Sequence, residues 1–272
     1  MKWELKREAR CCSTFIRRAV LGVSVFAICQ VAVGAPQGYE ILWQDDFKGN
    51  SLNLDSWTVG SQKRDDALQA AEAISVSDGT LRIRTYTTGG LHYTGFLSTA
   101  KRLSRSYGYF EARILFRGAP GEWCAFWLQS PSYGREVGSP SRSGVEVDIA
   151  EHRVSDKGGR DVGNWIAFNL HWDGYGRDHK QMGNLWRSPT PLNATWHTYA
   201  VLWTPDGFSF FVDNIQRWQS SAVVSDVPQD IRLTCEVRDD SWAGSIPKGG
   251  YGSRDLSLIG MDVDWVRVWH KP

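Results

Sequence analysis

The chain has 272 residues and is almost neutral, with 31 Lys and Arg against 30 Asp and Glu. Residues 1–34 carry six of the basic and two of the acidic residues, which leaves 25 basic and 28 acidic residues in the rest of the chain. This balance excludes a strongly basic nucleic-acid-binding surface, so no nucleic-acid partner is expected. The 14 tryptophans are more than a core can easily bury, and exposed indole faces suit the flat rings of sugars.

The N-terminal segment has the layout of an export signal. The apolar run "AVLGVSVFAICQVAVGA" ends in small residues and follows a basic segment that includes Lys6, Arg7, Arg10, Arg17 and Arg18. The run is shorter than the ~20 residues that a membrane-spanning helix needs. The pattern predicts a signal peptide over residues 1–34 and a secreted or periplasmic mature protein, without membrane contact, over residues 35–272.

Two cysteines, Cys124 and Cys235, remain after the predicted cleavage. An exported protein permits one disulfide between them. Two buried thiols are the alternative, because the strand patterns below turn both side chains inward without indicating that they meet.

From residue 39 onward, short β-rich runs alternate with turns rich in Gly, Asp, Asn and Pro. The segments "SVSDGTLRIRTYT" and "YAVLWTPDGFSFFVDN" each place a DG turn between alternating strands, as β-hairpins do. Residues 65–73 are the one stretch with a helical pattern. The sequence therefore predicts an all-β fold, a jelly-roll sandwich of two antiparallel sheets, in a single domain that we expect to be monomeric.

Three strands can be sorted into faces by their alternation. Their inward faces are apolar: Cys124, Phe126 and Leu128; Ile166, Phe168, Leu170 and Trp172; Ile231, Leu233, Cys235 and Val237. Their outward faces carry candidate substrate-binding residues: Trp123 and Trp127; Trp165, Asn169 and His171; Glu236. If the strands are neighbours, these side chains form one aromatic and polar floor.

The segment "GVEVDIAEHR" carries three acids, Glu146, Asp148 and Glu151. In a regular strand, Glu151 would point into the core, opposite to Glu146, because the two are an odd number of positions apart. A lone buried Glu is costly, and a β-bulge near Ile149 or Ala150 would return it to the outward face. We therefore expect three carboxylates in one cleft.

Paired carboxyls in a cleft suit retaining glycoside hydrolysis, in which one attacks the anomeric carbon and the other, roughly 5 to 5.5 Å away, protonates the leaving oxygen. Mutual repulsion would separate their pKa values as these two roles require. Taken alone, however, the E-x-D-x-x-E pattern also fits an exposed acidic strand that only keeps the protein soluble.

Several segments together resemble glycoside hydrolase family 16: "GYEILWQDDFKGNSLNLDSW", "YGYFEARI", "GEWCAFWLQSP", "GVEVDIAEHR" and "MDVDWVRVW". The resemblance implies a β-jelly-roll with a concave substrate cleft. It also implies that Glu146 is the nucleophile, Asp148 its helper and Glu151 the acid/base. The E-x-D-x-x-E spacing resembles the motif of the family branch that contains laminarinases, agarases, carrageenases and porphyranases. Lichenases have the shorter motif E-x-D-x-E.

The expected function is an endo-acting retaining hydrolase of a β-linked polysaccharide, first a β-1,3- or mixed-linkage β-glucan, with no cofactor required for catalysis. The alternatives are a hydrolase of agar, carrageenan or porphyran, a transglycosylase, and a non-catalytic carbohydrate-binding jelly roll.

Glu236 and Arg238 could bind an acidic sugar, but we expect them to pair with each other. Asp264 is a candidate ligand of a structural Ca²⁺, by resemblance to other family members.

Overall fold

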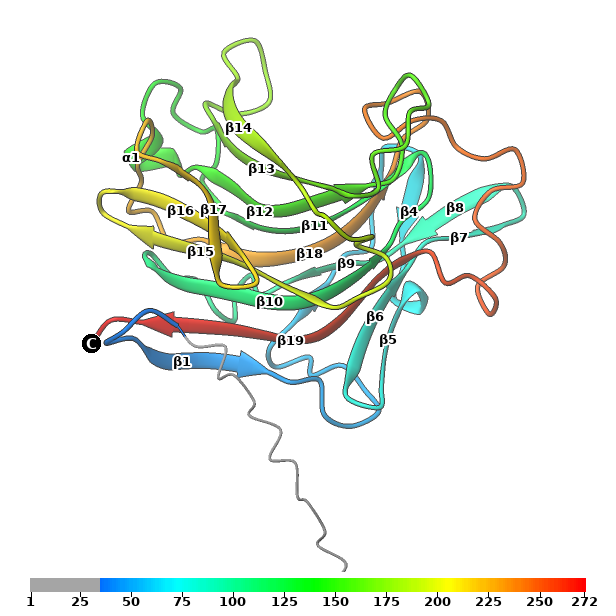
Figure 1. Ribbon diagram of the computed structural model, residues 1–272, viewed down its shortest axis with the longest axis horizontal. Coiled ribbons are helices and arrows are strands. Elements are labelled where there is room, and N and C mark those ends of the chain that lie inside the picture. The colour runs from blue at the N-terminus through cyan, green and yellow to red at the C-terminus, as the bar shows by residue number, and fades with distance from the viewer. Residues whose placement is uncertain (1–34) are drawn as a thin grey trace, which may run out of the picture. The chain divides into compact units, whose positions relative to one another are not determined.

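The computed structural model describes residues 35–272, so the predicted signal peptide lies outside the described residues. Two large antiparallel sheets face each other, as Figure 1 shows, and a small third sheet lies beside them. Among residues 35–272, no helix has both the length and the apolar character needed to cross a membrane.

The first large sheet has eight strands. Its hydrogen-bonded order is β17 (Ile215–Ser220), β16 (Gly207–Val212), β15 (His197–Thr204), β10 (Gly108–Arg117), β19 (Gly260–His270), β6 (Thr80–Arg84) and β5 (Ile74–Ser77), with β1 (Glu40–Asp45) also paired to β19. The DG hairpin predicted in "SVSDGTLRIRTYT" joins β5 to β6, and both Asp78 and Gly79 have the positive φ of a tight hairpin turn.

The second large sheet carries the three sorted strands and the acidic strand. Its order is β14 (Lys180–Arg187), β13 (Trp165–Trp172), β12 (Glu146–Arg153), β11 (Glu122–Gln129), β18 (Asp230–Val237), β9 (Phe96–Ser98) and β2 (Thr58–Val59). Four of these strands, β13, β12, β11 and β18, are consecutive neighbours, so their outward faces are continuous as predicted.

The core lies between the two large sheets. Cys124, Phe168 and Leu233 on the second sheet and Phe110 and Val266 on the first belong to one buried apolar cluster. The assignment of inward faces on β11, β13 and β18 is therefore confirmed. Cys124 and Cys235 also meet: they are paired across β11 and β18, and their thiol Sγ atoms lie 3.1 Å apart.

The small sheet contains β3 (Lys63–Arg64), β4 (Ala67–Gln69), β8 (Leu91–Thr94) and β7 (Tyr86–Thr88). Strand β4 and the 3₁₀-helix η1 (Ala71–Ala73) occupy the stretch for which the sequence suggested a helix, so that expectation was wrong. Strand β4 gains backbone partners on both sides, from β3 and β8, and these tertiary pairings override the local pattern. The one α-helix within residues 35–272 is α1 (Pro140–Ser143).

The predicted β-bulge is present in β12. Trp127 on β11 is opposite Asp148, whereas the preceding Phe126 is opposite Ala150, so Ile149 is the extra residue. On the other side of β12, the register likewise slips by one position between Asp148 and Glu151. Ile149 and Ala150 are both fully buried in the core, and Glu151 consequently points out of it.

Candidate active site

A cleft of about 470 Å³ lies over the outward face of the second large sheet. Of the residues predicted for the site, eight line it: Trp123, Trp127, Glu146, Asp148, Glu151, Asn169, His171 and Glu236. Trp165 is not among the lining residues and lies near the guanidinium of Arg187, with Cζ 5.8 Å from the ring centroid. The strand alternation and the bulge thus bring all three acids into the same cleft.

Glu146 is largely buried, and one of its carboxylate oxygens receives both of its protein hydrogen bonds. Gln129 Nε2 and Tyr175 OH each donate to Oε2 of Glu146. Gln129 Nε2 also donates to the hydroxyl of Tyr175 at 2.7 Å, which joins the three groups into a triangle. The two donors thereby hold the Glu146 carboxylate in place through one of its oxygens.

Asp148 lies between the two glutamates and is held by a histidine pair. His171 Nε2 is 3.1 Å from Asp148 Oδ2, and His171 Nδ1 is 2.9 Å from His179 Nε2. Burial raises the pKa of Asp148 well above its ordinary value, and the nearby charges of Glu146 and Glu236 raise it further. Asp148 is therefore suited to hold a proton and donate a hydrogen bond beside Glu146.

Glu151 has the environment of a proton donor. Burial raises its pKa well above the ordinary value for Glu, and Asp148 raises it further whenever Asp148 is ionised. Asn169 Nδ2 donates to Glu151 Oε2 at 2.6 Å and opposes this shift. The carboxyl therefore stays protonated closer to neutral pH than an exposed Glu would, as a general acid requires.

Aromatic side chains form one wall of the cleft. The rings of Trp123 and Trp242 meet edge to face at 5.8 Å, and Arg153 lies over Trp242 with its Cζ 4.3 Å from the ring. Trp127, by contrast, is only 3% exposed and donates its indole N–H to Thr234 at 3.1 Å. Trp123 consequently offers a freer face to a ligand than Trp127 does.

The predicted pairing of Glu236 with Arg238 was wrong. Arg64 Nε of the small sheet lies 2.7 Å from Glu236 Oε2, whereas Arg238 follows the end of β18 and is exposed. Burial raises the pKa of Glu236 to about 7, although the adjacent Arg64 lowers it. Arg64 also lies near Trp127 and lines the cleft.

Two clusters within residues 35–272 could offer three ligand atoms to a metal ion: Glu146, Asp148 and His171; and Glu122, Cys124 and Cys235. Asp264 belongs to neither, and its Oδ2 lies 2.5 Å from Arg113 Nη1. The calcium site at Asp264 stays a prediction, and an ion there would have to displace Arg113.

The predictions did not include Arg64, Gln129 and Tyr175, and the sequence did not decide whether Trp242 lines the cleft or caps the core. Tyr175 lies in the loop between β13 and β14 and Trp242 in the loop after β18, where alternation assigns no face. Gln129 is the last residue of β11, and Arg64 comes from a two-residue strand of another sheet. Gln129 is an even number of positions from Trp123 and Trp127, so strand alternation places it on the same outward face. This was the one sequence feature that could have indicated any of these residues.

A sandwich of antiparallel sheets with three acids in an aromatic cleft defines a class, the glycan-processing jelly rolls. The family model described as "Beta-porphyranase A-D, GH16 domain" matches residues 43–271. The chain therefore belongs to glycoside hydrolase family 16.

Curated relatives are similar at low identity. The chain is 22% identical to glucan endo-1,3-beta-glucosidase A1 of Niallia circulans and 23% identical to keratan-sulfate endo-1,4-beta-galactosidase of Sphingobacterium multivorum. Each alignment covers 88% of the chain but only 40% and 57%, respectively, of the relative's own length.

Solved structures have the same fold. Porphyranase B from Zobellia galactanivorans superposes with a TM-score of 0.69 at 22% identity, covering 85% of the chain and 92% of its own. The endo-beta-1,3-glucanase from Pyrococcus furiosus superposes with a TM-score of 0.67 at 23% identity, covering 85% and 94%.

Proposed function

We propose that the chain is a secreted, monomeric, endo-acting retaining hydrolase of β-linked polysaccharide. The observation that carries the proposal is the pair Glu146 and Glu151, which line one cleft in contrasting environments. Glu146 accepts two hydrogen bonds on one carboxylate oxygen, whereas burial raises the pKa of Glu151 and favours its protonated form. One carboxyl is thus prepared to attack and the other to donate a proton.

In the first step, Glu146 attacks the anomeric carbon while the glycosidic bond breaks and the departing oxygen takes the proton of Glu151. Glu146 is then esterified to the sugar, and Glu151 is an anion. In the second step, Glu151 removes a proton from water, the water oxygen attacks the anomeric carbon, and Glu146 leaves as a carboxylate. Asp148, two positions from Glu146 on the same face of β12, would donate a hydrogen bond to the nucleophile when it holds a proton.

The first substrate candidate is a β-1,3- or mixed-linkage β-glucan. This choice is supported by relatives named as a glucan endo-1,3-beta-glucosidase and a beta-glucanase, the latter from Rhodothermus marinus at 27% identity over 73% of the chain. The edge of the cleft formed by Trp123 and Trp242 offers apolar rings to the faces of neutral sugars.

A second candidate is a galactan such as agar, carrageenan or porphyran. The family model that matches the chain carries the porphyranase name, and two guanidinium groups, those of Arg64 and Arg153, line the cleft. Guanidinium groups bind sulfate-like anions through charge-assisted hydrogen bonds. A sulfated sugar would give these arginines a role that a neutral glucan does not need.

The decisive experiment measures reducing ends released by the purified protein from laminarin, lichenan, agarose, carrageenan, porphyran and xyloglucan. Glu146→Gln should lower turnover of the preferred substrate by more than about 10³-fold while preserving fold and oligosaccharide binding. Glu40→Gln, on the exposed part of β1, is the matched control and should retain full activity. Substantial hydrolysis by Glu146→Gln, or binding without hydrolysis by the parent, would refute the proposal.

A further inference from the structure

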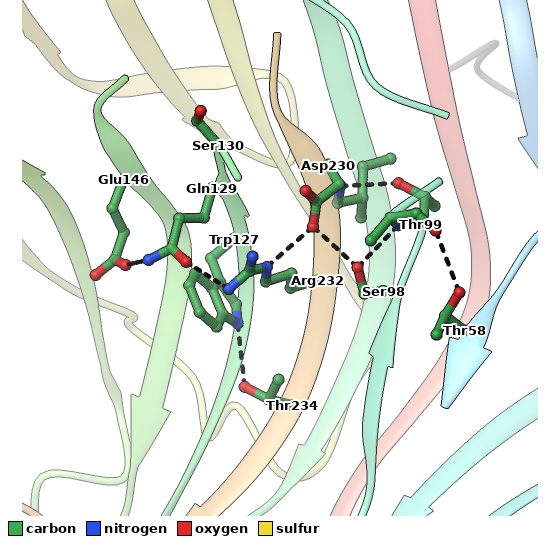
Figure 2. Close-up of polar contacts among 12 residues, drawn as sticks. Thr58, Ser98, Thr99, Trp127, Gln129, Ser130, Glu146, Asp230, Arg232 and Thr234 are labelled. Atoms are coloured by element: carbon green, nitrogen blue, oxygen red, sulfur yellow. Dashed lines mark hydrogen bonds and ion pairs between the residues drawn. The ribbon is translucent and has the colours of Figure 1, made fainter. Parts of the chain in front are cut away.

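A chain of polar contacts runs from the nucleophile candidate across the second sheet, and Figure 2 shows it. It starts at Glu146, passes through Gln129 on β11 and Arg232 on β18, and ends at Asp230 and Ser98. Neither Gln129 nor Arg232 is among the residues that line the cleft. Any influence of these two residues on the reaction is therefore exerted without contact with the substrate.

The first link decides which oxygen of Glu146 is free. Both Gln129 Nε2 and Tyr175 OH donate to Oε2, so within residues 35–272 the protein donors to this carboxylate converge on a single atom. Oε2 is thereby engaged as an acceptor, and Oε1 is left to attack the anomeric carbon. After attack, Oε2 becomes the carbonyl oxygen of the ester and can keep both donors.

The second link decides which way the Gln129 amide faces. Arg232 Nη1 donates to Gln129 Oε1 at 2.6 Å. A guanidinium can only donate and a carboxylate can only accept, so the amide oxygen must face Arg232 and the amide nitrogen must face Glu146. Without Arg232, the amide could rotate and present its oxygen to the carboxylate, which would repel it.

The third link holds Arg232 itself. Its Nε donates to Asp230 Oδ2 at 3.0 Å, and Ser98 Oγ donates to the same oxygen at 2.9 Å. Its Cζ lies 4.7 Å from the centroid of the Trp127 ring. The side chains of Arg232 and Asp230 are only 17% and 1% exposed, so solvent screens this pair weakly.

We propose that Arg232 is a positioning residue for Glu146: acting through Gln129, it fixes the amide that leaves Oε1 of the nucleophile free to attack. The inference rests on the proposed role of Glu146. In this arrangement Trp127 has a structural role, because the guanidinium of Arg232 lies against its ring. The arrangement also gives a reason for a buried cation two contacts away from the nucleophile.

The test uses Gln129→Met, Arg232→Met and the double variant, assayed on whichever of laminarin, lichenan, agarose, carrageenan, porphyran and xyloglucan the parent cleaves fastest. We expect kcat to fall roughly 10- to 100-fold in each single variant, since each removes hydrogen bonding to a charged group. KM should change by less than about 2-fold, because uniform substrate binding is untouched. Arg232→Lys should recover part of the loss, since Lys supplies the charge without the fork.

The double variant distinguishes a relay from separate effects. If Arg232 acts through Gln129, the double variant has the same kcat as Gln129→Met alone. Arg217→Met is the matched control. Arg217 is on β17 of the first large sheet, and its Cζ lies 4.5 Å from the centroid of the Trp186 ring. Its loss should leave kcat unchanged.

Additive losses in the double variant, a change confined to KM, or a parent-like kcat in Gln129→Met would overturn the inference while leaving the proposed function intact. Arg232→Met leaves Asp230 buried without its cation and could fail to fold; thermal denaturation would reveal this, and Gln129→Met and Arg232→Lys then decide the question. A parent enzyme inactive on laminarin, lichenan, agarose, carrageenan, porphyran and xyloglucan would instead refute the proposed function, and the inference with it.

Discussion

The hydrogen bond from Asn169 to Glu151 should control the upper pH limit of activity. Asn169 Nδ2 donates to Glu151 Oε2 at 2.6 Å, which stabilises the carboxylate and lowers a pKa that burial and Asp148 raise. Asn169→Ala removes the donor, so the pKa of Glu151 should rise further. Because the proton donor must be protonated, the alkaline limb of the pH profile should move to higher pH.

The size of the shift follows from the strength of the lost contact. A hydrogen bond to a charged group contributes about 1.5 to 3 kcal/mol, and about 1.36 kcal/mol corresponds to one pKa unit. Glu151 is partly exposed, so solvent replaces some of the lost interaction and the lower end applies. We expect the alkaline limb to move up by about 1 pH unit.

The measurement is kcat/KM against pH on the preferred polysaccharide for the parent, Asn169→Ala and Asn169→Asp. The aspartate variant should shift further in the same direction, because it replaces the donor by a second negative charge. Asn184→Ala is the control, since Asn184 is exposed on neighbouring β14. An alkaline limb that stays in place or moves to lower pH in Asn169→Ala would show that Glu151 is not the acid or that this hydrogen bond does not govern it.

Two further predictions concern the core and the cleft wall. Burial raises the pKa of Glu122 to about 7 from 4.5, so the folded state keeps a proton that the unfolded state releases. The free energy of unfolding should therefore fall by up to about 3 kcal/mol as pH rises from 4.5 to 7. Glu122→Gln, neutral throughout, should lack this part of the pH dependence in denaturant unfolding, and an unchanged slope would contradict the assignment. Trp123→Ala should raise KM about 10-fold with little change in kcat, as expected for loss of an apolar contact with sugar; an unchanged KM would place the substrate elsewhere.

Sequence periodicity predicted what depends on regular alternation. The inward faces of β11, β13 and β18 followed from a period of two, and the misplaced Glu151 revealed the bulge because a buried unpaired Glu is too costly. The same reasoning brought Asn169 and His171 to the acids, since neighbouring strands share an outward face.

The parts that periodicity missed depend on loops and on contacts between sheets. Tyr175 reaches Glu146 from a loop, and Arg64 reaches Glu236 from the small sheet, whose parallel β4–β8 pair has no local signature. The stretch at residues 65–73 was misread because its partners are distant in sequence. Donor-to-acceptor chains such as that through Arg232 need three-dimensional neighbours before they can be recognised.

The bulge at Ile149 also bears on how such an enzyme can change over evolutionary time. Removal of this one residue would leave Glu146, Asp148 and the following Glu at every second position of an uninterrupted strand, all still facing the sugar, because the insertion and the kink cancel each other. A single-codon deletion would thus be geometrically silent at the catalytic surface, and its cost would fall on the packing beneath, where a fully buried isoleucine is lost. The longer and shorter acidic motifs of the family therefore differ by one buried residue, and exchanging one for the other does not require the active site to be rebuilt.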